Sequence, residues 1–192
     1  VYLERLLEKP RHIEFQLLGD QHGGAVHLFE RDCSVQRRNQ KVIEEACAPA
    51  IPRAGIEEIA GKVAAMVKGM GYDNIGTVEM LRGADGSFNF LEMNTRLQVE
   101  HGVTEKITGV DLVQSQIRSA AGEKLADILP AKIEIKGHAL QARVYAEDPK
   151  NFFPSPGKLT VFRPPQDATV RVDTGYAEGR DVTPFYDPMI AK

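Results

Sequence analysis

Apolar and polar residues alternate along the first part of the chain. In the segment 12–20 (HIEFQLLGD), apolar Ile13, Phe15 and Leu17 alternate with polar His12, Glu14 and Gln16, which is the period of a β-strand. The pair Gly23-Gly24 separates this segment from another strand-like one, residues 25–30, so the pattern predicts a hairpin. Residues 41–46 are a further strand candidate, because two prolines impose a loop soon after them.

A helical period follows. Between residues 56 and 70, apolar side chains recur every three or four positions and a glycine follows, which predicts a helix. Residues 75–81 and 88–93 are strand candidates on either side of the turn RGADGS, and a second helix is expected near residues 111–121. After Pro130 the chain changes to short strand-like segments with proline-rich turns, so we expect a domain boundary there.

Composition and charge exclude several classes of protein. The chain has 192 residues, of which 42% are hydrophobic, and this is enough for the core of one domain or two small ones. Its 24 basic and 27 acidic residues give a net charge of −3, without the basic character of nucleic-acid-binding domains. No leader or apolar stretch of membrane-spanning length is visible, so we expect a soluble, cytoplasmic protein with no nucleic-acid or membrane partner. Cys33 and Cys47 lack metal-ligand spacing, so we expect reduced thiols and no zinc site.

Two carboxylates face each other in the second predicted hairpin. If the turn is centred on Asp85-Gly86, with two or four residues in the loop, Glu79 falls opposite Glu92, with Cβ atoms about 4.5–5.5 Å apart. Like charges at this separation are destabilising unless they are neutralised. Mg²⁺ is a natural neutraliser, because it binds one or two carboxylates together with substrate phosphates. The hairpin therefore predicts a divalent-cation site.

The residues after this hairpin continue its polar pattern. If the chain stays extended, one face carries five polar side chains, Glu92, Asn94, Arg96, Gln98 and Glu100. Such a face offers ligands for a cation, a guanidinium for an anion and a spare carboxylate as a base. The alternative is the solvated face of an amphipathic strand, and the opposed Glu79 favours the site.

Other charged residues carry weaker signals. Arg37, Arg38 and Lys41 form a basic cluster, which is either a solvated face or, beside a metal site, a holder of phosphate or another anion. Periodicity alone favours an ordinary polar-face role for His12. Arg143 is, by the same reasoning, a half-exposed strand arginine.

The segment EMNTRLQVEH, residues 92–101, closely resembles the biotin carboxylase branch of the ATP-grasp enzymes. The likeness covers essentially the whole chain, through PRHIEFQ, ERDCSVQRRNQKVIEEA, GTVEM, VTEKITGVDLV, GHALQARVYAEDP, PSPG and YDPMIAK. It implies an α+β fold. Residues 1–130 would form the C-terminal part of an ATP-grasp domain, an antiparallel sheet with helices. Residues 137–192 would form part of the small, β-rich biotin carboxylase C-terminal domain.

The resemblance also implies a reaction, the carboxylation of biotin by ATP and bicarbonate through carboxyphosphate, as the biotin carboxylase component of an acyl-CoA carboxylase. ATP, Mg²⁺ or Mn²⁺, and biotin on a separate carrier domain or subunit would be the cofactors. A carboxyltransferase and a second copy of the chain would be partners, with a mitochondrial matrix location in a eukaryote. The alternatives are a urea or amide carboxylase of the same family, or a fragment with a structural or dimerising role.

Residue roles follow from the resemblance, position by position. The metal ligands would be Glu79, Glu92 and Asn94. The nucleotide contacts would be Glu4, Arg5, Leu6, Leu7, His12, Gln36, Asn39, Glu79, Leu81 and Glu92. The bicarbonate contacts would be Lys41, Arg96, Gln98 and the backbone N–H of Val99. Glu100 matches the general base for bicarbonate and Arg143 the group that stabilises the biotin enolate, while Lys41 and Arg96 join them as catalytic residues.

The sequence departs from the family at two positions. Asn39 stands where many biotin carboxylases have His, and Gly102 replaces the usual Pro. Because Gly is more flexible than Pro, we expect looser positioning of Glu100. The family's glycine-rich lid loop and its upstream phosphate-binding lysines have no counterpart here, so we expect the 192 residues alone not to turn over ATP.

Overall fold

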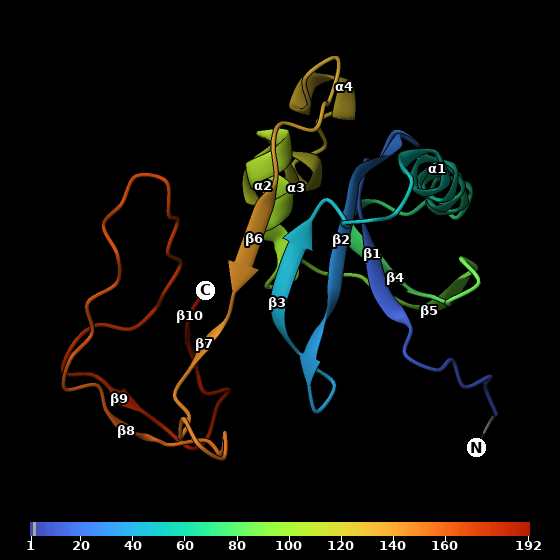
Figure 1. Ribbon diagram of the computed structural model, residues 1–192. Helices are drawn as coiled ribbons and strands as arrows, with labels where there is room; N and C mark the ends of the chain where they lie inside the picture. Colours follow the sequence, from blue (N-terminus) through green and yellow to red (C-terminus); the bar gives the residue numbers. More distant parts are fainter. Residues whose placement is uncertain (2) are drawn as a thin grey trace. The chain divides into compact units, whose positions relative to one another are not determined.

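The structure is a computed structural model that describes residue 1 and residues 3–192, and it divides into two compact units, residues 1–141 and 142–192 (Figure 1). The residues just after Pro130 pack with the first unit, since the Lys136 N–H donates to the Ile107 carbonyl at 2.8 Å. The domain ranges 1–130 and 137–192 stay a prediction.

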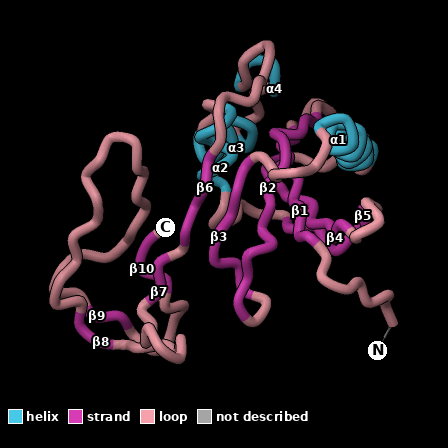
Figure 2. Tube along the Cα trace, in the orientation of Figure 1, coloured by secondary structure: helices cyan, strands magenta, loops and turns pink. Residues whose placement is uncertain are grey.

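A six-stranded sheet forms the first unit, in the order β5-β4-β1-β2-β3-β6 (Figures 1 and 2). Its strands are β1 (Arg11–Gly19), β2 (Ala25–Arg37), β3 (Gln40–Ala46), β4 (Asn74–Arg82), β5 (Phe88–Asn94) and β6 (Ala139–Ala142). Neighbours from β5 to β3 pair antiparallel, which confirms the predicted strands and both hairpins. β2 is longer than expected, because it pairs with β1 through its first part and with β3 through its last.

Helix α1 (Arg53–Gly69) covers one face of this sheet and confirms the predicted helix. Its buried stripe consists of Ile56, Ala60, Val63 and Val67. These side chains pack with the odd-numbered residues of β1, which are Ile13, Phe15 and Leu17. This face of the sheet is therefore closed by an apolar core.

Three helices follow β5, namely α2 (His101–Thr108), α3 (Leu112–Ala120) and α4 (Leu125–Ile128). The predicted second helix is confirmed by α3, whose first turn is capped by Asp111 accepting from the Gln114 N–H at 2.8 Å. The expectation of an extended chain to Glu100 is wrong. β5 ends at Asn94, and the His101 N–H donates to the Gln98 carbonyl at 3.2 Å, a turn that leads directly into α2.

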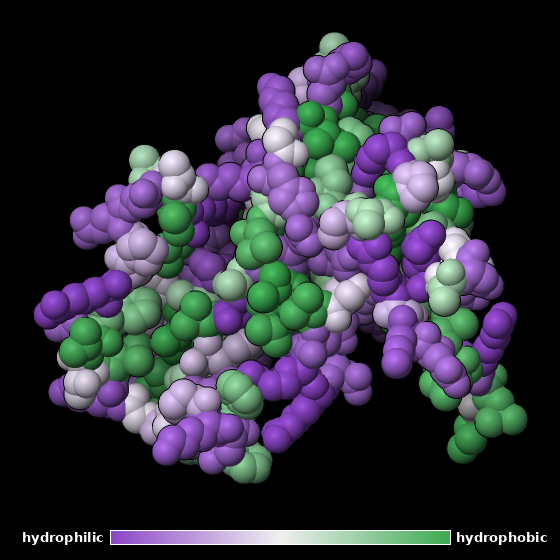
Figure 3. Space-filling view, in the orientation of Figure 1, coloured by the Kyte–Doolittle hydropathy of each residue, from purple (hydrophilic) through white to green (hydrophobic). Residues whose placement is uncertain are grey.

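The second unit consists mostly of loops between short strands, as the proline-rich sequence predicted. β7 (Val144–Tyr145) pairs with β10 (Met189–Ala191), and β8 (Gly157–Lys158) pairs with β9 (Asp181–Val182). Among its residues, all of them described, only Val182 and Ala191 are apolar and buried. Many other apolar side chains of this unit are exposed, for example Phe153, Val161 and Phe185. Figure 3 shows such hydrophobic residues in green on the surface of the molecule.

No helix in the described part of the chain is long and apolar enough to cross a membrane.

Candidate functional site

A row of charged residues crosses four strands of the first unit. Strand register places Glu14 of β1 between Arg31 of β2 and Glu79 of β4, and places Glu79 opposite Glu92 of β5. The predicted pairing of Glu79 with Glu92 is therefore confirmed. Because even-numbered residues of β1 point away from α1, the row lies on the face opposite the apolar core.

The turn that produces this pairing differs from the prediction. The loop has five residues, Gly83 to Ser87, with the Gly83 N–H donating to the Ser87 carbonyl at 2.9 Å, and Arg82 pairs with Phe88. A register shift next to Glu79 then adds one residue on β5. The bulge restores the register that a two- or four-residue loop would have produced, so Glu92 still meets Glu79.

Lys41, on β3, joins three carboxylates of the site. Its Nζ contacts Glu14 Oε1 and lies 3.0 Å from Glu79 Oε1 and 2.7 Å from Glu100 Oε1. Burial favours the neutral amine, but the charges of Glu14 and Glu100 outweigh it and raise the pKa of Lys41. Lys41 is therefore a fixed cation beside the proposed base Glu100.

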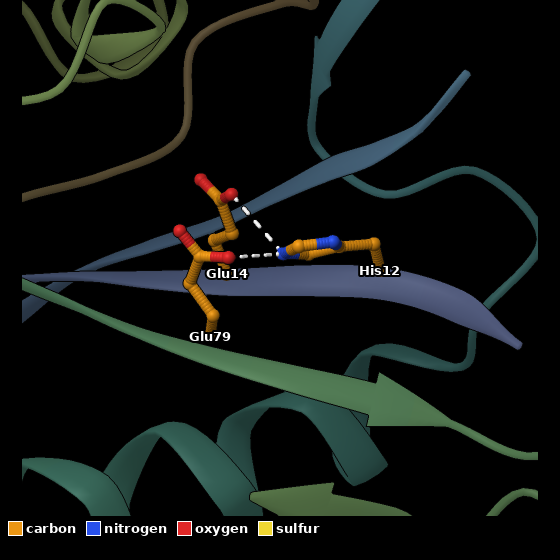
Figure 4. A group of neighbouring side chains, drawn as sticks. All are labelled: His12, Glu14 and Glu79. Atoms are coloured by element: carbon orange, nitrogen blue, oxygen red, sulfur yellow. Dashed lines mark ion pairs between the residues drawn. The ribbon is translucent and has the colours of Figure 1, made fainter. Parts of the chain in front are cut away.

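His12, on β1, lies between two carboxylates (Figure 4). Its Nε2 is 2.5 Å from Glu79 Oε2 and 3.3 Å from Glu14 Oε1. Burial lowers the pKa of His12, but the close negative charges of Glu14 and Glu79 outweigh burial and raise it to about 9. The same contacts help to hold the pKa of both carboxyl groups below their usual values, against burial, which raises them. His12 is thus an imidazolium at neutral pH, and it lies on the polar face, as periodicity predicted, where two carboxylates pair with it.

The predicted metal ligands lie together at the β4–β5 end of the row. Asn94 Nδ2 donates to Glu79 Oε1 at 2.9 Å and to Glu92 Oε1 at 3.0 Å, so the amide bridges the two carboxylates. Asn94 Oδ1 accepts from Arg96 at 3.1 Å. The repulsion between Glu79 and Glu92 is therefore reduced by the Asn94 amide and by the cationic Lys41 and His12 beside Glu79, so a divalent metal ion is not needed to keep the two carboxylates together.

The donor set nevertheless fits Mg²⁺, which prefers carboxylate and amide oxygens. Glu92 is exposed, and Asn94 is its one partner among the contacts described, so its carboxylate is open to a cation. Glu79 Oε1 already accepts from Lys41, Asn94 and Gln98, so an ion at Glu79 would use Oε2 or displace one donor.

Some predicted nucleotide residues gather around His12. Leu81 is its cross-strand partner on β4, and the Gln36 amide nitrogen lies 3.0 Å from His12 Nδ1. Asn39 lies at the β2–β3 turn with φ 63°, a left-handed conformation that Asn tolerates well. The backbone of the turn therefore accounts for an asparagine at this position. The remaining four are in the segment before β1, all exposed except half-buried Leu7, and they are Glu4, Arg5, Leu6 and Leu7.

Three of the four predicted bicarbonate residues, Arg96, Gln98 and Val99, lie in the turn between β5 and α2, and the fourth, Lys41, lies on β3. Gln98 is buried and donates to Glu79 Oε1 at 2.7 Å, and Glu100 is the N-cap residue of α2. The Val99 carbonyl lies 3.4 Å from Gln141 Nε2. Gly102 is helical and buried in the first turn of α2, and a Cβ there would lie 3.3 Å from Gln141 Oε1. Arg143 belongs to the second unit, between β6 and β7.

Two buried residues of this site were missed from the sequence. Glu14 and Arg31 are both fully buried, and Arg31 donates to Glu14 Oε2 from Nε at 3.2 Å and from Nη2 at 3.1 Å. The signal for Glu14 was its alternation with His12 and Gln16 along β1. Arg31 carried no such signal, because only the strand register shows that it meets Glu14.

The antiparallel sheet with its charged face is of the ATP-grasp type, as comparison with known proteins shows. Residues 1–128 match the family described as "Carbamoyl-phosphate synthase L chain, ATP binding domain", and residues 141–192 match "Biotin carboxylase C-terminal domain". The chain belongs to the biotin carboxylase family of ATP-grasp proteins.

Individual relatives support this assignment. Biotin carboxylase 2 of Bacillus subtilis (strain 168) is 56% identical over 195 residues, covering 100% of this chain and 43% of the relative. The alpha chain of the mitochondrial methylcrotonoyl-CoA carboxylase of Rattus norvegicus is 50% identical, covering 99% of this chain and 27% of the relative.

A solved structure agrees with these sequence relatives. It is the biotin carboxylase domain dimer of Hydrogenobacter thermophilus 2-oxoglutarate carboxylase, in complex with MgADP, ADP and bicarbonate. It superposes with a TM-score of 0.94 at 45% identity, covering 98% of this chain and 42% of that one. The chain therefore spans less than half the length of these relatives.

Proposed function

We propose that the full-length protein containing this chain is a biotin carboxylase. It uses ATP and bicarbonate to carboxylate carrier-linked biotin through carboxyphosphate. The observation that carries the proposal is the buried contact of Glu100 with Lys41 at 2.7 Å, in a cluster that also contains Glu79 and Gln98. A carboxylate base and a fixed cation side by side are what deprotonation of a bound bicarbonate requires.

Each residue has a stated part in this reaction. Lys41, Arg96, Gln98 and the Val99 N–H hold bicarbonate. Glu100 accepts the bicarbonate proton on its carboxylate, and the freed oxygen attacks the γ-phosphorus of ATP as ADP leaves. Arg143 would hold the ureido group of carrier-linked biotin, where its guanidinium would stabilise negative charge on the ureido oxygen.

Other residues bind the nucleotide and the metal ion. Glu79, Glu92 and Asn94 bind Mg²⁺ or Mn²⁺, and the ion when bound neutralises phosphate charge. The nucleotide contacts fall on the segment before β1, on His12 with its neighbours Gln36 and Leu81, and on Asn39 at the β2–β3 turn.

We further propose a biotin carrier and a carboxyltransferase as partners, and a dimer of the full-length protein. Relatives include a propionyl-CoA carboxylase of Ruegeria pomeroyi and a pyruvate carboxylase of Methanothermobacter thermautotrophicus, so family membership leaves the carboxyl acceptor open. The Hydrogenobacter thermophilus domain is described as a dimer.

Two substitutions in the full-length protein test the assignment by separating the nucleotide site from the base. Glu92→Gln removes a charged metal ligand, so we expect KM for MgATP to rise on the order of tenfold. Glu100→Gln removes the base, so we expect bicarbonate-dependent ADP release to fall on the order of 10²-fold, with MgATP binding within about threefold of wild type. Steady-state kinetics and nucleotide titration measure both effects.

Glu58→Gln is the control, because Glu58 lies on exposed α1 surface and pairs only with Lys62 among the contacts described. It should match wild type in both assays. Unchanged MgATP affinity in Glu92→Gln would remove the metal assignment, and unchanged turnover in Glu100→Gln would remove the base.

A further inference from the structure

Among the contacts described for the charged face, Arg31 makes the most side-chain hydrogen bonds. Of the residues proposed to bind bicarbonate, nucleotide or metal, these bonds reach Gln98 alone. Arg31 is fully buried. Besides its two bonds to Glu14, the guanidinium donates at 2.6–3.3 Å to four acceptors, Gln16 Oε1, Thr104 Oγ1, Thr77 Oγ1 and Gln98 Oε1. These acceptors belong to β1, α2, β4 and the turn before α2, so one side chain of β2 ties three other elements to the turn that carries Gln98.

The first consequence is the orientation of the Gln98 amide. Arg31 Nη2 donates to Gln98 Oε1 at 2.9 Å, and Gln98 Nε2 donates to Glu79 Oε1 at 2.7 Å. Because Oε1 is held by a guanidinium that can only donate, the amide has one satisfied orientation, with its nitrogen toward the carboxylates. The Glu79 carboxylate can only accept and requires the same orientation, so Arg31 and Glu79 hold the amide from its two ends, and without Arg31 the Gln98 oxygen would lose its partner.

The second consequence concerns charge. Two permanent cations, Arg31 and Lys41, lie among three buried carboxylates, Glu14, Glu79 and Glu100. Arg31 occupies Glu14 Oε2 and leaves Oε1 to Lys41. If Arg31 lost this pairing, Lys41 would face the carboxylates with one fewer cation beside it. An incoming anion would then meet a more negative site.

We infer that Arg31 is a positioning residue for bicarbonate, which orients Gln98 and balances Glu14 so that Lys41 can hold the anion. The inference rests on the proposed function. It predicts that Arg31 affects bicarbonate far more than the nucleotide, because no described contact joins Arg31 to Glu92, Asn94 or His12.

The test is Arg31→Lys in the full-length protein, with bicarbonate-dependent ADP release as the assay. Lysine keeps the charge but loses the planar fork, so we expect KM for bicarbonate to rise on the order of tenfold or more. KM for MgATP should stay within about threefold of wild type, and Arg31→Met should raise KM for bicarbonate further still. The matched control is Arg53→Lys, since Arg53 pairs with another buried carboxylate, Glu30, outside the site. It should leave both KM values unchanged.

A milder pair of variants serves if Arg31→Lys does not fold. Thr104→Val keeps the shape of the side chain and removes one acceptor of Arg31, at 3.1 Å, so KM for bicarbonate should rise about two- to fivefold. Thr108→Val removes another buried hydroxyl of α2 that bonds only to backbone atoms in the described structure, and it should not change that KM.

The outcomes separate the inference from the function. Absence of bicarbonate-dependent ADP release in the wild-type protein would contradict the proposed function. An active wild type with unchanged KM for bicarbonate in Arg31→Lys and Thr104→Val would overturn the inference alone. Equal losses for bicarbonate and MgATP would overturn it too, because they would show a merely structural role.

Discussion

His12 shows how a single residue couples this site to pH. Its pKa of about 9 in the folded protein lies above its ordinary value of 6.5, because two carboxylates outweigh burial. A raised pKa means that the imidazolium stabilises the fold fully below pH 6.5, and that this stability is lost as the pH rises through 9. We therefore expect the free energy of unfolding of the chain to fall between these values, on the order of 2–3 kcal/mol.

Urea unfolding at several pH values between 6 and 10 measures this loss, with His12→Gln as the comparison. The variant has no group that titrates in this window at position 12, so its unfolding free energy should change less than that of wild type. Parallel curves for the two proteins would show that the imidazolium adds no stability. His22 is a suitable control residue, because it lies away from the cluster and its ring contacts the Gly122 carbonyl.

At the residue scale, the sequence predicted charged groups whose partners lie close along the chain or across one hairpin. Glu79 and Glu92 could be paired because a short turn links their strands. Glu14 and Arg31 could not, because their importance depends on burial and on the register of β1 between two other strands. A polar residue on an amphipathic strand has the same sequence pattern whether water or a second layer of protein covers it.

At the element scale, the β4–β5 hairpin shows that a correct pairing can follow from an incorrect turn. The five-residue loop alone would place Glu79 opposite Leu91, and the extra β5 residue at the bulge moves Glu92 into that place. Bulges leave no clear mark in sequence, so the prediction could not have included this one. The start of α2 was missed for a related reason, since the polar alternation of residues 92–100 continues after β5 has ended.

Helix α1 supports the site from the opposite face of the sheet, and its contribution to stability can be measured. Ile56 is 1% exposed and packs in the core with Phe15 of β1. We expect Ile56→Ala to lower the free energy of unfolding by about 2–4 kcal/mol, through lost burial and a residual cavity. Met66→Ala, on the same helix but 41% exposed, should cost about 0.5 kcal/mol or less. Urea unfolding of the two variants measures the difference, and equal costs would contradict the packing described for α1.

At the scale of the whole molecule, the two units differ in how much apolar surface they bury. The first contains three apolar clusters, built on both faces of its sheet and on α1 to α4. The second buries two apolar side chains, Val182 and Ala191, in 51 residues. Short domains with so little core are marginal or unfolded without other support.

We therefore expect the units to behave differently when they are separated. A fragment of residues 1–142, which keeps β6 intact, should unfold cooperatively in urea and show the dispersed amide NMR spectrum of a folded protein. Residues 142–192 alone should show the narrow dispersion of an unfolded chain, because its four short strands form two separate pairs with little core between them. A well-dispersed spectrum for residues 142–192 would show that its backbone pairing and loop contacts suffice without an apolar core. An unfolded 1–142 fragment would show that the sheet, with its buried charged row, needs the rest of the chain.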